Sequence, residues 1–215
     1  MSSVVTRTVL REQVKELLLE RILAGEYRPG DRLVETRIAQ ELGTSQAPVR
    51  EALRDLELLR FVESQPFRGA RVREVCAEEL AEIYPVRAAV EEVAAQEAAL
   101  RLDGRVEALE DELAAMRRAA AAGDLHALAA HDVGFHRLIV EASGNRTLLD
   151  VWTSLQVEAR TIITALATGI DHHELADMHE PVLAALAERD PERAGRALRR
   201  HIEEFGELLL RGGTQ

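Results

Sequence analysis

Aromatic residues and cysteine are scarce in this sequence. Phe, Trp and Tyr make up 3% of the 215 residues, so the cores must be built mainly from aliphatic side chains, which favours helices over strands. The single cysteine, Cys76, excludes an internal disulfide. No run approaches the ~18 consecutive apolar residues of a membrane span, and the start of the chain carries charges where a signal peptide would be apolar. We therefore expect a cytoplasmic protein that makes no membrane contact.

The net charge of -11 is distributed unevenly along the chain. Residues 1–75 carry 13 basic and 12 acidic side chains, whereas residues 76–215 carry 14 and 26. Strong net acidity disfavours binding to nucleic acid, but the first part of the chain is close to neutral. A DNA-binding role must therefore depend on where the arginines of that part lie.

The first 75 residues have the pattern of a winged helix-turn-helix. Apolar residues at helical spacing, together with turn and cap residues, predict three helices over 4–24, 34–42 and 45–59. Pro29-Gly30 predicts the turn before the second helix, and Gly43 ends that helix. Two short β-rich runs, 61–63 and 70–73, surround residues 66–69 and predict a hairpin, the wing.

The rest of the chain, residues 76–215, is helical in period throughout. Stop and start signals divide it into about six helices, with breaks near residues 103, 123, 144, 170 and 190. Gly123 ends one helix and Asp124 caps the next, while Asp190-Pro191 places proline in a first helical turn. The expected fold is thus mostly α: a winged helix (1–75) followed by an all-helical bundle (76–215).

The third predicted helix separates a packing face from a reading face. Val49, Leu53 and Leu56 form an apolar stripe, while Gln46, Arg50 and Arg54 recur every fourth residue on another face. Glutamine pairs well with adenine, and arginine with guanine or phosphate, in the major groove of DNA. The alternative is a solvated face on which the arginines pair with Glu51 and Glu57.

The stretch that contains this helix closely resembles the winged-helix domain of the GntR family. It has a G-x-x-x-P-G-x-x-L turn, an S-x-x-P-V-R-E-A-L-R-x-L recognition helix and a G-A-x-V wing. The resemblance spans residues 8–73 and implies binding to double-stranded operator DNA as a homodimer. The DNA contacts we expect come from the helix start, its exposed face and the wing: Ser45, Gln46, Ala47, Arg50, Arg54, Arg68 and Gly69. Family members commonly have Ser-Arg-Thr where this chain has Ser45-Gln46-Ala47, so this chain lacks an arginine and a hydroxyl at the start of the helix.

Four polar residues of the second part fall on apolar helix faces. Asp132 and His136 are four residues apart and share one face, and His179 and His201 lie among apolar residues of other helices. A buried carboxylate is costly unless compensated, so these residues predict a divalent metal site. One carboxylate and three imidazoles suit Zn, Ni, Fe or Mn. Each histidine taken alone would more often be simply hydrogen-bonded in the core.

These positions resemble the D-x-x-x-H, H and H of the FCD ligand-binding domain, which defines the FadR-type branch of the GntR family. The resemblance covers residues 77–211 and implies that the four residues are metal ligands and that an organic acid binds beside the metal. Arg87 is then a candidate clamp for the effector carboxylate, or alternatively the internal partner of Glu91. Asn145 is a second candidate effector contact, although a role as a helix cap would also explain it.

The combined prediction is a cytoplasmic, homodimeric transcriptional regulator, a repressor controlled by a small organic acid. Two rivals remain open at this point. A metal-dependent enzyme domain fused to a winged helix would use the open metal positions for hydrolysis or oxidation, but no general base or nucleophile stands at a motif spacing. A metal-free regulator that responds to acyl-CoA would have little use for Asp132 and the three histidines.

Overall fold

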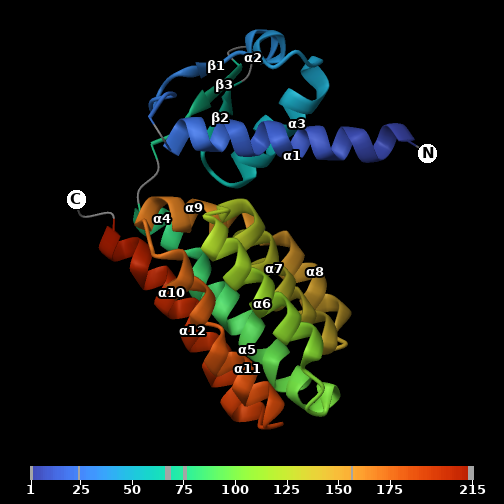
Figure 1. Cartoon of the computed structure of the whole chain (residues 1–215). Coiled ribbons are helices and arrows are strands. Elements are labelled where there is room, and N and C mark those ends of the chain that lie inside the picture. The colour runs from blue at the N-terminus through green and yellow to red at the C-terminus, as the bar shows by residue number, and fades with distance from the viewer. Residues whose placement is uncertain (1, 24, 66–68, 75–76, 156, 213–215) are drawn as a thin grey trace. The chain divides into compact units, whose positions relative to one another are not determined.

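The computed structural model describes residues 2–23, 25–65, 69–74, 77–155 and 157–212 of the chain (Figure 1). Its contacts divide the chain into two units, Met1–Cys76 and Ala77–Gln215. The predicted fold class is confirmed, because the chain is mostly helical and a small sheet accompanies the helices of the first unit. Each unit is described by itself.

The first unit is a winged helix-turn-helix. Its described residues form three helices and three short strands: α1 (Ser2–Leu23), β1 (Arg32–Leu33), α2 (Glu35–Glu41), α3 (Gln46–Leu58), β2 (Val62–Gln65) and β3 (Gly69–Val72). The strands β2 and β3 form the predicted hairpin, with Val62 opposite Val72 and Gln65 opposite Gly69. The strand β1, which the sequence led us to expect only as a turn, adds to the free edge of β3 in an antiparallel ladder.

The core of the first unit lies between α1 and α3. Val49, Leu53 and Leu56 of α3 are buried, as the periodicity predicts, and they share this core with Leu18 of α1. Between α2 and α3, Gly43 adopts a φ of +62°, a backbone conformation that is costly for residues with a Cβ. This glycine permits the tight turn that sets the reading helix against α2.

The second unit consists entirely of helices within the described residues (Figure 1). Its helices in chain order are α4 (Ala77–Ala81), α5 (Ile83–Leu102), α6 (Glu107–Ala122), α7 (Leu125–Ala142), α8 (Arg146–Ser154), α9 (Val157–Thr168), α10 (His172–Asp177), α11 (Glu180–Ala187) and α12 (Pro191–Gly212). The six predicted segments are all helical, but three of them are divided into two helices each. Two of the divisions have a proline in the first turn of the following helix, Pro85 in α5 and Pro181 in α11. Proline suits a first turn and interrupts a continuing helix, because it lacks the backbone N–H.

Small residues allow α5 and α12 to pack closely along their length (Figure 1). Ala88, Ala95 and Ala99 of α5 have no exposed surface. A Cβ added to Gly206 of α12 would come within 2.8 Å of Tyr84 on α5, closer than real side chains allow. This close approach holds α12 against α5 and fixes the position from which α12 projects its histidine into the interior.

Candidate metal centre and nucleic-acid interface

The reading helix α3 presents its polar face to solvent. Gln46, Arg50 and Arg54 are exposed, on a face of the helix next to the buried stripe. The N-cap residue Ser45 is also exposed, Ala47 is half-buried, and Gly69 is exposed at the start of β3. Arg68, the predicted wing-tip contact, lies outside the described residues. The N-terminus of a helix attracts anions such as the phosphates of DNA. The first turn of α3 contains no acidic residue that would repel them.

Arg50 is held by the preceding helix in this structure. Its Nε and Nη2 atoms donate to Glu35 Oε2 at 3.0 and 2.8 Å, and Glu35 stands in the first turn of α2. Glu57, one of the two alternative partners considered for the arginines, instead accepts from the backbone N–H and the hydroxyl of Ser64, each at 2.9 Å. These hydrogen bonds with Glu35 orient the guanidinium of Arg50. Because the Arg50 side chain is 51% exposed, its guanidinium also remains accessible to solvent.

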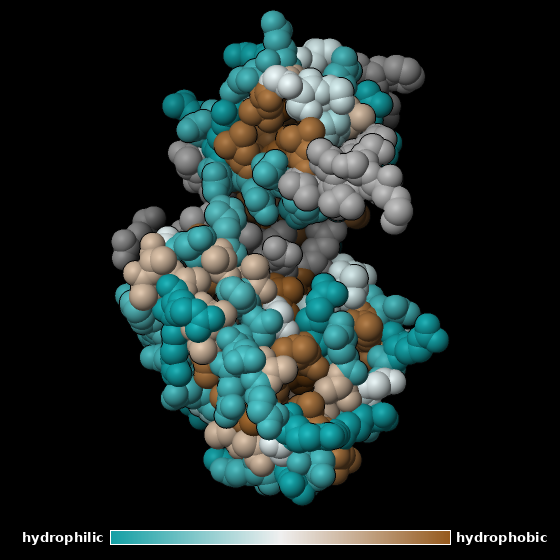
Figure 2. Space-filling view, turned by 45° about the vertical axis from the view of Figure 1, so that its right-hand side comes forward, coloured by the Kyte–Doolittle hydropathy of each residue, from teal (hydrophilic) through white to brown (hydrophobic). Residues whose placement is uncertain are grey.

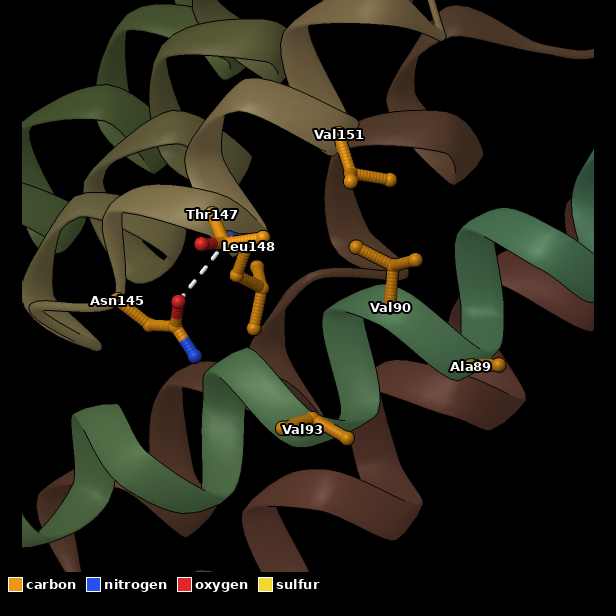
Figure 3. A pocket seen from close by; sticks show the side chains of 7 residues that line it. All are labelled: Ala89, Val90, Val93, Asn145, Thr147, Leu148 and Val151. Carbon is orange, nitrogen blue, oxygen red and sulfur yellow. Dashed lines mark hydrogen bonds between the residues drawn. The ribbon is translucent and has the colours of Figure 1, made fainter.

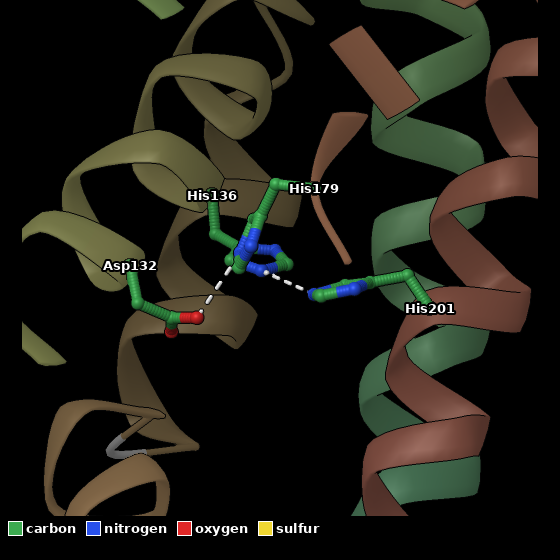
Figure 4. A group of neighbouring side chains, drawn as sticks. All are labelled: Asp132, His136, His179 and His201. Carbon is green, nitrogen blue, oxygen red and sulfur yellow. Dashed lines mark hydrogen bonds and ion pairs between the residues drawn. The ribbon is translucent and has the colours of Figure 1, made fainter. Parts of the chain in front are cut away.

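The four predicted metal ligands converge in the interior of the second unit (Figure 4). Asp132 and His136 come from α7, His179 immediately precedes α11, and His201 comes from α12. Each offers one ligand atom, and these atoms all lie within 4.8 Å of one another. His136 Nε2 lies 3.2 Å from His201 Nε2, and His179 Nε2 lies 3.1 Å from Asp132 Oδ1. The sequence placed these side chains inside, and the structure brings all four together.

Two of the three histidines have their Nδ1 atoms against groups that can only accept. Nδ1 of His136 contacts the carboxylate of Glu91, and Nδ1 of His179 lies 3.2 Å from the carbonyl oxygens of Leu175 and Ala176. Nδ1 must therefore carry the proton in the neutral rings, which leaves a lone pair on each Nε2. Among the described residues, His179 Nε2 lies close to Asp132 without a hydrogen bond to it, and His201 Nδ1 is buried with no hydrogen-bond partner.

Burial and neighbouring charges set the ionisation of the cluster. Burial alone would raise the pKa of Asp132, but the neighbouring histidines His179 and His136 reverse the effect and lower it. Burial, together with the other two histidines, lowers the pKa of His201 well below its usual value, and burial likewise lowers the pKa of His136. At neutral pH the cluster thus offers an ionised carboxylate from Asp132 and uncharged imidazoles from His136 and His201. This donor set, with its unpartnered nitrogen atoms, fits a divalent metal.

Arg87 and Glu91 form a buried ion pair beside this cluster. Arg87 Nε donates to Glu91 Oε1 at 2.6 Å, and both side chains are buried on α5. Burial alone would raise the pKa of Glu91, but the positive charge of Arg87 and the contact with His136 lower it to about 2. The internal pair considered in the sequence is therefore present. However, Arg87 Nη2 is buried and has no hydrogen-bond partner within the described part of the chain, so the pair leaves this donor unused there.

Several buried polar residues near the cluster were not anticipated from the sequence. Thr161 donates its hydroxyl to Asp132 Oδ2 at 3.2 Å, and Trp152 Nε1 donates to Glu91 Oε1 at 2.8 Å. Tyr84 OH and Thr164 Oγ1 lie 2.6 Å apart, also buried. A single threonine or tryptophan in an apolar helix is common, so the sequence held no specific signal for these contacts.

Asn145 acts as a helix cap in this structure. Its Oδ1 accepts from the backbone N–H of Leu148 at 3.1 Å at the start of α8, as the dashed line in Figure 3 marks. The side chain is exposed and lines a shallow groove of about 350 Å³ between α5 and α8. The other residues of the groove are mostly apolar: Ala89, Val90, Val93, Thr147, Leu148 and Val151. The groove contains none of the four candidate metal ligands.

A winged helix-turn-helix followed by an all-helical unit defines a class of two-domain transcriptional regulators. The chain belongs to the GntR family: residues 10–72 match the family described as "Bacterial regulatory proteins, gntR family" and residues 82–204 match the FCD domain. It is a DNA-binding transcriptional regulator and not an enzyme. No helix in the described part of the chain has the length and apolar character needed to cross a membrane.

Similar proteins are regulators of the same kind. The chain is 36% identical over 200 residues to the "Probable D-xylose utilization operon transcriptional repressor" of Paenarthrobacter nicotinovorans, covering 93% of this chain and 88% of that protein. It is 26% identical to the gluconate operon transcriptional repressor of Bacillus licheniformis, covering 86% and 78%. Among solved structures, Escherichia coli McbR/YncC matches with a TM-score of 0.68 and 26% identity, covering 94% of this chain and 97% of that one. A GntR regulator from Rhodococcus sp. RHA1 matches with a TM-score of 0.66 and 26% identity, covering 93% and 97%.

Proposed function

We propose that this regulator is a repressor whose helical unit binds a divalent metal ion and a small organic acid, and whose two winged helices in a homodimer bind operator DNA. The observation that carries the proposal is the convergence of one buried carboxylate and three buried imidazoles, with ligand atoms within 4.8 Å of one another. The two relatives described above are named as repressors, which supports repression as the mode of regulation.

Asp132, His136, His179 and His201 would hold the metal. When bound, a metal with open positions supplies a Lewis acid to which an effector oxygen can coordinate. The chain's own residues exclude water and orient the ligand atoms: Thr161 holds Asp132 Oδ2, and backbone carbonyls hold the ring of His179. Zinc, nickel, iron and manganese all suit this donor set.

Arg87 is the proposed contact for the effector carboxylate. A guanidinium presents several donors in a planar fork that matches a carboxylate, and Arg87 Nη2 is buried with no partner among the described residues. A buried unpaired donor is costly, and an anionic ligand would satisfy it. The relatives named for D-xylose and gluconate operons support a sugar acid as the effector class. Since Asn145 caps α8, we propose no further role for it.

Gln46, Arg50 and Arg54 are the proposed base and phosphate contacts, together with the N-terminal end of α3 and the wing around Gly69. A helix that enters the major groove reads with the exposed residues of its N-terminal half. Backbone N–H groups at Ser45–Ala47 would contact phosphates and so position α3 on the DNA. The side chains of Gln46 and Arg50, which lie nearest the start of the helix, would discriminate between bases. Arg68 would contribute at the wing tip.

A second copy of the chain is the proposed occupant of the apolar face of α5. Val86, Val93 and Leu100 are 50%, 48% and 64% exposed, and with half-buried Val90 they repeat at heptad spacing, the pattern of a helix–helix seam. Brown surface is visible between the hydrophilic regions of the helical unit in Figure 2. The face is self-complementary about Val93. In an antiparallel pair of α5 helices, Leu100 of one copy would lie opposite Val86 of the other. Arg101, at the basic end of α5, would then lie near Glu82 of the second copy. Closed two-fold dimers of this kind reuse one patch on both copies.

The proposal is tested with duplexes selected from a randomised library by the full-length protein. We expect a salt-sensitive preference for a two-fold symmetric sequence, and release of that DNA by an organic acid only when the protein is loaded with metal. A panel of sugar acids, dicarboxylates and fatty acyl-CoA, each with and without metal, separates the metal-dependent regulator from the acyl-CoA alternative. Release by acyl-CoA in metal-free protein would overturn the metal-dependent mechanism, and absence of any sequence preference would overturn the proposed DNA contacts.

A further inference from the structure

Glu91 is the shared acceptor of a buried network that reaches the candidate metal centre. Its side chain has no exposed surface. One oxygen, Oε1, accepts from Arg87 Nε at 2.6 Å and from Trp152 Nε1 at 2.8 Å, while the other, Oε2, contacts His136 Nδ1. The three partners come from α5, α8 and α7, so one carboxylate connects three helices of the unit.

The contact with His136 determines which ring nitrogen carries the proton. An ionised carboxylate has no proton to donate, so His136 must present Nδ1–H to Glu91 and must keep the lone pair on Nε2. Nε2 is the atom that lies 3.2 Å from His201 Nε2 on the inner side of the cluster. A carboxylate behind a ligating histidine also makes the ring a better electron donor and holds its orientation.

We propose that Glu91 is a positioning residue that locks His136 in its metal-binding tautomer. This inference rests on the proposed metal site but adds a residue that does not itself bind the metal. The competing explanation is that Glu91 serves only to neutralise Arg87 and to join α5 to α8. The two oxygens of Glu91 allow a test, because Oε2 alone serves His136, whereas Oε1 serves Arg87 and Trp152.

The test compares zinc affinity, measured by competition with a chromophoric chelator, in the full-length wild type, in Glu91→Gln and in Trp152→Phe. In Glu91→Gln the amide oxygen can still accept from Arg87 and Trp152, but the amide NH2 faces His136 Nδ1 and favours the proton on Nε2. We expect the zinc affinity to fall roughly 10- to 100-fold in Glu91→Gln. Trp152→Phe removes a donor from the same carboxylate without touching Oε2, so its zinc affinity should stay within about threefold of the wild type.

A charge-balanced variant covers the case in which Glu91→Gln fails to fold because Arg87 is left as an unpaired buried charge. In Arg87→Met/Glu91→Gln both charges are removed, and the same loss of zinc affinity is expected. Equal affinities in the wild type and in a folded Glu91→Gln or double variant would overturn the proposal, as would an equal loss in Trp152→Phe.

The tautomer can be read directly in the metal-free wild type from the 15N shifts of its histidine rings. We expect His136, assigned through His136→Gln, to carry its proton on Nδ1, and a proton on Nε2 would overturn the inference even if zinc binds. If the wild type binds no zinc while His136 shows the Nδ1–H form, the proposed metal site fails and the role of Glu91 in setting the tautomer stands. The two failures are therefore distinguishable.

Discussion

His136 Nε2 on α7 and His201 Nε2 on α12 lie 3.2 Å apart in the interior of the helical unit, although the two residues are 65 positions apart in the chain. Burial lowers the pKa of both imidazoles, so at neutral pH the two rings meet as uncharged groups. Glu91 holds the Nδ1 proton of His136, which turns a nitrogen lone pair of that ring toward His201. A cation between the rings would convert this contact into a favourable one.

Metal loading should therefore stabilise the protein. At a free metal concentration about 100 times the Kd, the free energy of unfolding is expected to rise by about 2.7 kcal/mol, because metal binds only the folded site. Urea denaturation of EDTA-treated protein with and without Zn²⁺ measures the change. His201→Ala should abolish the rise, whereas His173→Ala, at an exposed position of α10, should retain it. An equal rise in His201→Ala would place the metal elsewhere.

Removing Arg50 should weaken binding to the selected operator duplex without changing the fold. The Arg50 side chain is exposed, and its guanidinium is hydrogen-bonded to Glu35. Arg50→Ala therefore leaves the core of the first unit intact. If Arg50 contacts a base, the affinity should fall roughly 10- to 100-fold for the selected sequence and much less for unrelated DNA. Fluorescence anisotropy at several salt concentrations measures both. Arg193→Ala, on the exposed surface of α12, is the control, and an equal loss there would contradict the assignment.

The reading helix could be predicted from the sequence in detail because its information is local. The buried stripe of Val49, Leu53 and Leu56 and the exposed positions of Gln46 and Arg50 follow from a period of 3.6 residues, and the structure confirms them as faces of one helix. The short strand β1 was missed, since a two-residue strand depends on a partner, β3, and not on a pattern of its own.

The candidate centre could be predicted only as a set of inward-facing residues. Periodicity indicated that Asp132 and His136 share a face, but it carries no information on which helix packs opposite. The contact between Glu91 and His136 joins α5 to α7, and the two residues are 45 positions apart. The boundary between α10 and α11 was missed for a different reason. Pro181 marked this boundary in the sequence, but a single helix was expected to continue across it.

Tyr84 should make the protein less stable at high pH. Burial raises the pKa of Tyr84 to about 12 from its usual 10. Between these values the unfolded chain has lost the phenolic proton and the folded chain retains it, so the folded state binds more protons and stability falls as pH rises through this window. Urea denaturation at pH 9 and pH 11 should show this fall, and Tyr84→Phe should reduce it. A fall of the same size in Tyr84→Phe would contradict the assignment.

Arg87→Lys should separate effector binding from metal binding. Lysine keeps a positive charge beside Glu91 but lacks the planar fork that offers two donors to a carboxylate. We expect the organic acid concentration needed for half-maximal DNA release to rise at least tenfold, the factor that corresponds to about 1.4 kcal/mol. The stabilisation by Zn²⁺ should stay close to that of the wild type, as differential scanning fluorimetry would measure. An unchanged effector response would leave Arg87 with a structural role only.

A charge at the centre of the α5 face should dissociate the proposed dimer. Val93 is 48% exposed and lies at the point where an antiparallel copy of α5 would meet itself, so Val93→Asp would place two like charges against each other and desolvate both. Sedimentation equilibrium should show a dimer for the wild type and a monomer for the variant at the same concentration. Leu210→Asp, at a position of α12 that is 46% exposed, is the matched control and should remain dimeric.

Because two reading helices on one dimer bind two half-sites, Val93→Asp should also lose affinity for the symmetric duplex while keeping its affinity for a single half-site. A monomeric wild type, or a Val93→Asp variant that stays dimeric, would assign the apolar face of α5 to something other than a second copy of the chain.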